Sequence, residues 1–430
     1  MNSKRIFVKS YGCSANQADG EVLSGCLAEA GFKIVPSDSE ADVLIYNCCA
    51  VKGPTEDRMF EVLKRAPREK QLIVAGCLPL ICHDRLRREV IFDGAVGSSL
   101  GVRIVDVVSR VLRGERVVAL DIPVENKPGL LLPRVRSSPV ISIVPVSYGC
   151  LGSCAYCCVV FARGRLRSYT PEEILTRIRA DLTSGTREFW LTSQDTGCYG
   201  KDICTNLANL LETICELPED FRIRVGMMTP NFARSMLADL VDAYRNPKVF
   251  KFLHLPVQSG DNTVLMRMRR GYKVEDFREI VETFRVNFPI IALATDVICG
   301  FPGETPEAFN KTVRLIGDLE PDVVNISKFF PRPGTAAAEM LDAVDPAEIK
   351  LRSLEMSKLV KRISLRKNQS WTGWVGEVLV DEKGKTRGSW IGRNFAYKPV
   401  VIQSSQNLLG KVICVKIVEI CSTYLAAEIL

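Results

Sequence analysis

The stretch "SYGCLGSCAYC", residues 147–157, follows the apolar run "VISIVPV" and holds Cys150, Cys154 and Cys157 in a C-x3-C-x2-C pattern. Three thiolates at this spacing can bind one face of a cubane iron–sulfur cluster and leave its fourth iron without a protein ligand. An iron with an open position can bind and reduce a small molecule. The pattern therefore favours an iron–sulfur cluster over a structural zinc site, which is closed by four protein ligands.

The composition is that of an ordinary globular protein. The chain has 430 residues, of which 47% are hydrophobic and 25% charged, enough for about two or three domains. No uncharged run approaches the ~20 residues of a membrane span, and the first residues show no signal-peptide pattern. We therefore expect a cytoplasmic protein with reduced cysteines and no membrane partner. The formal net charge of +7 fits a polyanionic partner without requiring one.

Residues 1–124 alternate short apolar runs (5–12, 41–48, 71–77 and 92–98) with helix-like stretches (18–31, 55–66 and 101–114). This alternation predicts a doubly wound parallel sheet. Cys13, Cys49 and Cys77 then fall at the carboxyl ends of three strands, the edge where open α/β sheets bind ligands. Neighbouring strands are only ~5 Å apart, so the three cysteines can meet. Spacing alone leaves two equal alternatives, a second cluster or three buried thiols.

A second βα series follows the proline-rich stretch 125–139, which we predict to be a linker. Apolar runs begin near residues 140, 188, 222, 251, 291 and 322, with helix-like stretches between them. The triad comes directly after the first of these runs. We assign residues 140–349 to this second unit.

Motifs along the whole chain resemble the radical S-adenosylmethionine (SAM) methylthiotransferases. They are "YGCSANQADGE" (11–21), "NCCAVKGPTE" (47–56), "AGCLP" (75–79), the triad, "RGRLRSYTPEEI" (163–174), "WLTSQDTGCYG" (190–200), "FLHLPVQSGDNTVLMRMRRGY" (252–272), "DVICGFPGET" (296–305) and "FFPRPGTAA" (329–337). The resemblance is strongest to the archaeal and eukaryotic threonylcarbamoyladenosine tRNA methylthiotransferases. It implies a partial (β/α)6 barrel and two [4Fe-4S] clusters, one on the triad and one on Cys13, Cys49 and Cys77. The motif "NCC" lacks the family's usual hydroxyl residue before the cysteine, which leaves Cys48 as an alternative ligand.

Residues that follow three strands of the second unit are predicted to contact SAM: Gln194, Asp195, Gln258, Ser259, Ile298, Gly300 and Gly303. The first two can meet the SAM ammonium with a carbonyl and a carboxylate oxygen. The next two suit ribose hydroxyls or the methionine carboxylate. The glycines permit close backbone approach to the adenine, beside an apolar isoleucine. Taken singly, each residue is more typical of a turn.

Arg163, Arg165 and Arg167 alternate just after the triad. This pattern is equally typical of a solvated strand edge and of a site for phosphate or the SAM carboxylate, since a guanidinium fork matches either anion.

The last region starts with residues 350–370, where seven lysines and arginines face a single acid, Glu355. Leu351, Leu354, Leu359, Ile363 and Leu365 recur near helical spacing, which predicts an amphipathic helix with a basic face. Residues 371–430 read as short strands with glycine punctuation, typical of a small antiparallel β-barrel, and resemble the TRAM RNA-binding domain. The residues expected to bind RNA are Lys361, Arg362, Arg366, Lys367, Lys383, Lys385, Arg387, Arg393 and Lys398, with Trp390, Phe395 and Tyr397 as stacking candidates.

The resemblance implies a tRNA methylthiotransferase that converts the C2–H of N6-threonylcarbamoyladenosine in the anticodon loop into C2–S–CH3. This sp2 C–H has no useful acidity and no leaving group, so a radical from reductively cleaved SAM has to activate it. The partners expected are tRNA, an electron donor and a sulfur source, the last two unidentified. Alternatives are a methylthiotransferase acting on isopentenyladenosine tRNA or on a ribosomal-protein aspartate, and, from another class, a non-catalytic RNA-binding protein.

Overall fold

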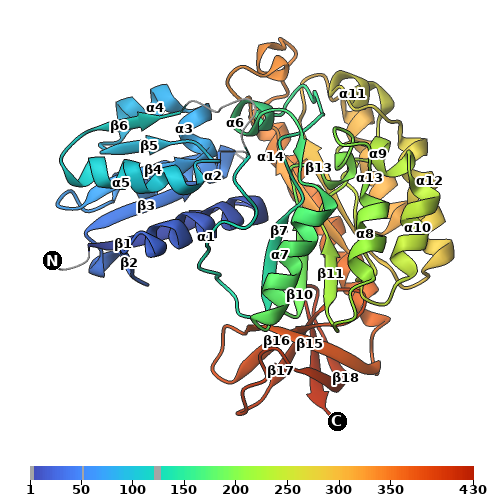
Figure 1. Cartoon of the computed structure of the whole chain (residues 1–430). Helices are drawn as coiled ribbons and strands as arrows, with labels where there is room; N and C mark the ends of the chain where they lie inside the picture. Colours follow the sequence, from blue (N-terminus) through green and yellow to red (C-terminus); the bar gives the residue numbers. More distant parts are fainter. Residues whose placement is uncertain (1–3, 51–52, 121–126) are drawn as a thin grey trace.

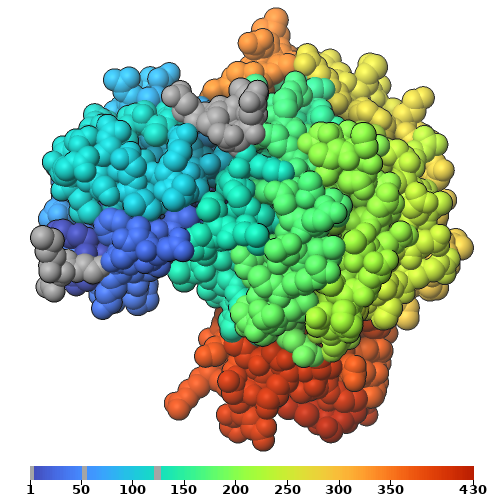
Figure 2. All heavy atoms as spheres, in the orientation of Figure 1, coloured from blue at the N-terminus to red at the C-terminus, as the bar shows by residue number. Residues whose placement is uncertain are grey.

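The protein consists of a central body with an N-terminal lobe at its side and a small β-barrel beneath it (Figure 1). The computed structural model describes residues 4–50, 53–120 and 127–430. In the space-filling view the blue N-terminal lobe lies against the green part of the central body, and open space separates it from the red barrel (Figure 2). The predicted order of three units along the chain is thus the order of three lobes in space.

The N-terminal lobe contains the predicted parallel sheet, with strand order β2-β1-β3-β4-β5-β6. Its strands are β1 (Arg5–Tyr11), β2 (Lys33–Ile34), β3 (Val43–Cys48), β4 (Gln71–Gly76), β5 (Gly94–Val96) and β6 (Val117–Ala119). Its helices are α1 (Ser14–Glu29), α2 (Gly53–Lys64), α3 (Cys77–Ile81), α4 (His83–Glu89) and α5 (Ile104–Leu112). The edge strands β2 and β6 and the helices α3 and α4 were not predicted, because they are too short to show a periodic pattern.

The central body is the predicted partial barrel. Its parallel strands are β7 (Ile141–Pro145), β10 (Glu188–Thr192), β11 (Arg222–Val225), β12 (Phe252–His254), β13 (Ala292–Cys299) and β14 (Val323–Lys328). They form two sheets, β7-β10-β11 and β12-β13-β14. Between them, Ile223 of β11 forms an isolated parallel bridge with Val249, and Met228 N donates to the His254 carbonyl of β12 at 3.0 Å. A short antiparallel hairpin, β8 (Ser147–Tyr148) with β9 (Arg167–Ser168), flanks the triad.

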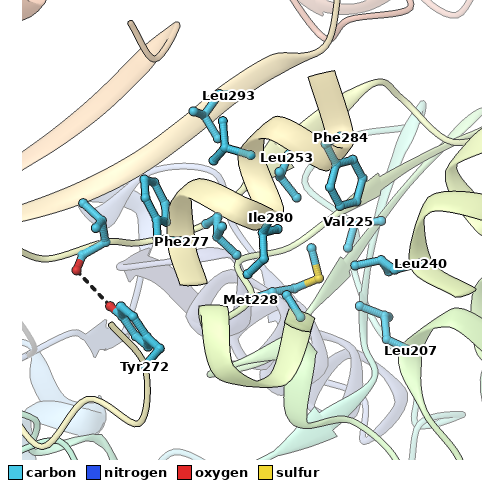
Figure 3. Packing of buried hydrophobic residues seen from close by; sticks show 14 of the residues in the cluster. Leu207, Val225, Met228, Leu240, Leu253, Tyr272, Phe277, Ile280, Phe284 and Leu293 are labelled. Atoms are coloured by element: carbon cyan, nitrogen blue, oxygen red, sulfur yellow. Dashed lines mark hydrogen bonds between the residues drawn. The ribbon is translucent and has the colours of Figure 1, made fainter. Parts of the chain in front are cut away.

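Helices cover the outside of this barrel and bury an apolar core against its strands. Figure 3 shows part of this core, where Phe277, Ile280 and Phe284 of one helix pack near Leu253 and Leu293. The Tyr272 hydroxyl in the same view donates a hydrogen bond of 2.8 Å to the Val257 carbonyl. The helices are α6 (Val159–Arg163), α7 (Pro171–Thr183), α8 (Leu207–Cys215), α9 (Pro230–Arg234), α10 (Leu237–Arg245), α11 (Asn262–Arg267), α12 (Val274–Asn287) and α13 (Pro306–Leu319).

The predicted linker packs along helix α1. Val135 N donates to the Glu21 carbonyl at 3.0 Å, and Ser137 N donates to the Glu21 carboxylate at 2.9 Å. A Cβ on Gly25 would collide with the Pro133 carbonyl, so glycine permits this close contact. Residues 125–126 of the linker, and 121–124 of the first predicted domain, lie outside the described residues.

The basic helix α14 (Pro346–Gln369) starts earlier than predicted. Asp345 caps it by accepting from Ala347 N at 2.8 Å, and a proline occupies its first turn, a typical start signal. Its predicted apolar face is partly wrong. Leu351, Leu354 and Leu365 are exposed, because the helix packs instead through buried residues that include Arg352, Met356 and Ile363.

The C-terminal β-barrel is closed in the order β15-β16-β17-β19-β18. The strands are β15 (Val375–Lys383), β16 (Ser389–Arg393), β17 (Pro399–Gln403), β18 (Val412–Ile420) and β19 (Leu425–Ile429). The predicted antiparallel pairing holds except that β17 and β19 run parallel, which closes the barrel.

The barrel docks against the amino ends of the central strands. Phe250, Phe252 and Ala292, all at or before the starts of β12 and β13, share one apolar cluster with barrel residues. Glu188, the first residue of β10, accepts hydrogen bonds from Trp190 Nε1 at 2.5 Å and the Tyr397 hydroxyl at 3.1 Å. The barrel therefore lies at the opposite end of the strands from the cysteine triad.

This docking interface should weaken as pH rises. Burial, with the charge of Asp381 nearby, raises the pKa of Glu188 from 4.5 to about 8, so the folded protein holds a proton there that the unfolded chain releases. The stabilisation is complete below pH 4.5 and is lost through about pH 8, as linkage requires. We expect Glu188→Gln to be the more stable protein by about 1–3 kcal/mol at about pH 9 and to differ little at about pH 4. Thermal unfolding of both proteins across this pH range tests the prediction. A stability difference that stays the same at every pH would contradict it.

Candidate active site

The three N-terminal cysteines follow neighbouring strands. Tyr11, Cys48 and Gly76 lie in register across β1, β3 and β4. Cys49 and Cys77 directly follow the last two, and Cys13 lies two residues after Tyr11. Adjacent strands are about 4.8 Å apart. The sheet therefore brings these cysteines to one edge, as their strand-end positions predicted.

A buried network of asparagines ties these strand ends together. Asn47 Nδ2 donates to the Ser10 hydroxyl at 3.1 Å and to the Asn16 carbonyl at 2.7 Å, while Asn16 Nδ2 donates to Asn47 Oδ1 at 2.7 Å. Gly76 has φ +95°, and a Cβ there would lie 2.5 Å from Asn47 Oδ1. Only glycine fits this turn, which places Cys77 at the start of α3. The network was not predicted, although both asparagines lie in the quoted motifs.

Cys48 and Cys49 occupy different environments. Cys48 is fully buried in an apolar cluster with Leu44 and Tyr46, and its Sγ lies 3.4 Å from the Tyr46 carbonyl. Burial raises the pKa of the Cys48 thiol far above its usual value. Cys49 follows the last residue of β3, is buried, and belongs to neither apolar cluster of this lobe. The two cysteines thus differ in environment, and Cys49 stays the predicted ligand with Cys48 as the alternative.

The triad occupies the loop between β8 and α6. Gly152 N donates to Cys150 Sγ at 3.2 Å, and Arg270 Nη1 donates to Cys154 Sγ at 3.0 Å. All three cysteines are partly exposed. Such N–H donors favour thiolates, the form that binds iron.

Arg270 is a site residue that the sequence interpretation missed. Besides Cys154, its guanidinium reaches the hydroxyls of Tyr156 at 3.5 Å and Tyr272 at 3.1 Å. Its Nη2 is buried without a hydrogen-bonding partner among the described residues, so one charged donor remains available. An orphaned donor beside three thiols fits an anionic cluster at this position. Arg270 lies in the quoted motif segment "RMRRGY", but nothing in the sequence distinguishes it from the surface arginines that are usual in such a segment.

Cys198 and Asp195 also lie beside the triad. The Sγ atoms of Cys150 and Cys198 and a carboxylate oxygen of Asp195 lie within 4.8 Å of one another. The Cys198 thiol donates to Cys150, and this lowers the pKa of Cys150. Asp195 accepts from Gly197 N at 3.0 Å and from the Thr229 hydroxyl at 2.6 Å. This predicted SAM contact is therefore next to the triad, although buried.

Of the other predicted SAM contacts, Gln194 lies beside the triad, whereas Gln258 and Ser259 make contacts elsewhere in the barrel. Gln194 lies beside the triad loop, where its Oε1 accepts from Gly149 N at 2.7 Å. Gln258 lies after β12 and has a left-handed backbone conformation with φ +67°. Its carbonyl accepts a hydrogen bond from Ile298 N at 3.0 Å. Ser259 is fully buried, and its hydroxyl lies near Thr312 and Asp261 N. The structure therefore turns Ser259 toward α13.

The predicted adenine-binding glycines are packing positions in this structure. A Cβ on Gly300 would collide with Ile349 of α14. A Cβ on Gly303 would lie 2.7 Å from both Arg267 Cζ and Asp342 Oδ2. Both have φ near +80°, which only glycine adopts readily. Contacts within the chain thus explain why both positions require glycine, and their predicted contact with SAM stays a prediction.

The two cysteine sets lie beside the same seam, the interface between the N-terminal lobe and the central body. Ser14, next to Cys13, shares a hydrogen bond of 2.7 Å with Thr192 at the carboxyl end of β10. Helix α3, which starts at Cys77, packs on α6, which starts two residues after Cys157. The Ser98 hydroxyl donates to the Ala162 carbonyl at 3.0 Å across the same seam. The contacts of this interface therefore involve residues next to both cysteine sets.

Some of the predicted RNA-binding residues are exposed, and others are buried or paired with acids. Lys361, Arg362 and Arg366 of α14 are exposed, and so are Lys383, Lys385 and Arg387 in the β15–β16 hairpin, while Lys367 is half-buried. Arg393 pairs with Asp381 at 3.0 Å. Lys398 is buried and pairs with Asp322 at 2.7 Å, so it is not available to a phosphate. Trp390 is buried and Phe395 is exposed.

Known proteins share each of these lobes. Family models match residues 144–316 (Radical SAM superfamily), 5–97 (Uncharacterized protein family UPF0004) and 369–430 (TRAM domain). The fold is similar to the radical SAM methyltransferase TsrM of Kitasatospora setae, with a TM-score of 0.57 at 14% identity over 78% of this chain and 77% of that one. The partial barrel and its triad thus define a radical SAM enzyme, a class that uses SAM and an iron–sulfur cluster.

Relatives that match nearly the whole chain show which family of radical SAM enzymes it belongs to. The chain is 42% identical to a probable threonylcarbamoyladenosine tRNA methylthiotransferase of Pyrococcus abyssi, over 99% of both chains. It is 37% identical to the threonylcarbamoyladenosine tRNA methylthiotransferase of Homo sapiens, over 97% of this chain and 72% of the human protein. The chain belongs to the threonylcarbamoyladenosine tRNA methylthiotransferase family. Among the described helices, none has the length and apolar content that a bilayer crossing requires.

Proposed function

We propose that this protein methylthiolates C2 of N6-threonylcarbamoyladenosine in the anticodon loop of tRNA, using two [4Fe-4S] clusters and SAM. The observation that carries the proposal is the seam, beside which the triad and the set of Cys13, Cys49 and Cys77 both lie. A reaction that joins a sulfur to a radical needs both partners at one place. Since the substrate is tRNA, we expect the enzyme to act in the cytoplasm.

The triad would hold the cluster that supplies an electron for cleaving SAM to methionine and a 5′-deoxyadenosyl radical, and the other set would hold the cluster that presents the sulfur. The chain itself fixes both ligand sets. Arg270 donates to Cys154 at 3.0 Å, and Asn47, two residues before Cys49, donates to Ser10 and Asn16, which flank Cys13. The site residues Gln194 and Asp195 lie beside the triad, where SAM must bind to be reduced.

Helix α14 connects the seam end of the central body with the β-barrel. Near its start, Ile349 packs on Gly300 after β13, and near its end, Asn368 Nδ2 donates to the Cys421 carbonyl at 2.8 Å. Its exposed cations therefore lie on the helix that leads from the seam end of the central body to the barrel. An extended polyanion such as tRNA can contact this helix while its loop enters the site.

The test is a product assay with the reconstituted protein, SAM and a chemical reductant. The substrates are tRNA carrying threonylcarbamoyladenosine, tRNA carrying isopentenyladenosine, and ribosomal protein. Mass spectrometry should find a methylthio nucleoside only from the first. Product from either other substrate would replace the proposed target, and absence of 5′-deoxyadenosine from every reaction would favour a non-catalytic RNA-binding protein.

Neutralising the basic face of α14 should weaken tRNA binding and reduce its salt dependence. In a variant with glutamine at Lys361, Arg362, Arg366 and Lys367, each lost phosphate contact should remove about 0.7–0.9 from the slope of log K against log salt. Binding curves at several salt concentrations measure the slope. The matched control is Arg113→Gln, an exposed change in the N-terminal lobe. A slope equal to that of the control would make α14 a solvated face only.

A further inference from the structure

A buried arginine lies in the seam between the two cysteine sets. Arg163 ends α6, a few residues after the triad, and is only 2% exposed. This burial contradicts the solvated strand edge considered from the sequence, while the alternative of a site for phosphate or the SAM carboxylate stays a prediction. The Arg163 guanidinium pairs with Asp19 of α1 at 2.6 Å.

The partners of Arg163 hold it in one orientation. The Tyr148 hydroxyl donates a hydrogen bond to Asp19, and the guanidinium lies 5.5 Å from the centre of the Tyr148 ring. The Arg163 carbonyl accepts from Arg167 Nη2 at 2.8 Å. Both Asp19 and Tyr148 are buried, so water does not screen these contacts. A long side chain with this many fixed partners is pre-organised.

The segment that bears Arg163 also packs beside the elements that follow two N-terminal cysteines. Helix α6, which Arg163 ends, packs on α3, which starts at Cys77, and the Ser98 hydroxyl donates to the carbonyl of Ala162, next to Arg163, at 3.0 Å. Asp19, the ion-pair partner of Arg163, lies in α1, which starts directly after Cys13. The Nη1 atom of Arg163 is buried and has no hydrogen-bonding partner among the described residues. A buried donor without an acceptor is costly, and an iron-bound thiolate beside it would be a strong acceptor.

We propose that Arg163 is a positioning residue for the N-terminal cluster, donating an N–H to the sulfur of Cys77 and placing a fixed positive charge beside the cluster. This inference rests on the proposed second cluster. A cation near an iron–sulfur cluster favours its reduced, more negative state, and hydrogen bonds to the sulfurs act in the same direction. Asp19 has the opposite electrostatic effect, since it partly cancels the charge.

The experiment measures the reduction potential of that cluster alone. In the full chain with Cys150, Cys154 and Cys157 changed to alanine, the remaining cluster is reconstituted and titrated by electron paramagnetic resonance. Arg163→Gln should lower the midpoint potential, and Arg163→Lys should restore part of the fall. Asp19→Asn, which leaves the arginine without its counter-charge, should raise the potential.

Arg332→Gln is the matched control. Arg332 is equally buried, crosses the same seam to Glu56, and contacts Cys158, which is not a predicted ligand. Loss of packing or of a seam ion pair should affect both arginine variants alike, whereas only Arg163→Gln should shift the potential.

The outcomes separate the two proposals. A loaded cluster with equal potentials in Arg163→Gln, Asp19→Asn and the parent would overturn the role of Arg163 and leave the proposed function standing. If Arg163→Gln does not bind the cluster, the midpoint potentials of Arg163→Lys and Asp19→Asn are compared with that of the parent. Shifts in opposite directions would support the role of Arg163, and shifts in the same direction would overturn it. A parent that binds no iron would remove the second cluster and this role with it.

Discussion

Replacing any one of Cys150, Cys154 and Cys157 by alanine should abolish reductive cleavage of SAM. The loop offers the cluster three protein thiolates, and the loss of one leaves too few ligands to keep it. Arg270 would at the same time lose an anionic partner in the case of Cys154. The measurement is 5′-deoxyadenosine formed by reconstituted protein with SAM and a chemical reductant, expected to fall to background in all three variants.

Cys158→Ala is the matched control for these variants. Cys158 follows the triad directly in sequence, but it is buried and contacts Arg332. We expect it to retain iron and SAM cleavage. Full 5′-deoxyadenosine formation by a variant of Cys150, Cys154 or Cys157 would exclude that residue as a cluster ligand. Loss of SAM cleavage in Cys158→Ala would make Cys158 a further candidate ligand.

The arrangement of the cysteines was predictable because it follows from strand topology. The runs that end near Tyr11, Cys48 and Gly76 are apolar and bounded by turns, and parallel strands place their carboxyl ends together. The order β1-β3-β4 makes the three strands neighbours, which the sequence pattern did not specify. The chain positions of Cys13, Cys49 and Cys77 were thus enough to predict a shared edge.

Residues whose role depends on contacts between lobes were not predictable. Arg163 and Lys398 read as surface cations because most arginines and lysines are exposed. Their partners Asp19 and Asp322 lie far away in sequence. Leu351 and Leu354 fit a helical apolar stripe, yet α14 buries Arg352 against Glu304 at 2.9 Å. Tertiary packing, which periodicity does not encode, decided each of these positions.

Glycines show the same limit. Gly300 and Gly303 were predicted to permit backbone approach to the adenine, which stays a prediction, and the structure adds that Ile349 and Arg267 fill the space that a side chain at these positions would need. Gly76 has the same kind of backbone conformation and does shape a predicted site, since it turns the chain before Cys77. A positive φ explains why glycine is required at a position, whereas only the neighbouring atoms show what the position is for.

Alanine at Cys13, Cys49 or Cys77 should separate the two halves of the proposed reaction. SAM cleavage should continue, because the triad and Arg270 are untouched, while methylthiolated tRNA should fall to background. Iron content should drop by roughly half on the two-cluster proposal. Iron analysis, 5′-deoxyadenosine and nucleoside mass spectrometry on the same preparations measure the three quantities.

The chain supplies a matched control for this experiment in Cys48, which is adjacent to Cys49 and packs with Leu44 and Tyr46. Removing a fully buried thiol leaves a small cavity and costs about 1 kcal/mol or more, but we expect Cys48→Ala to keep its iron and its product. If Cys48→Ala loses both and Cys49→Ala keeps both, the ligand is Cys48. Normal iron and normal product in Cys13→Ala would argue against a cluster at this edge, because the strand order leaves no other cysteine at the end of β1 to replace it.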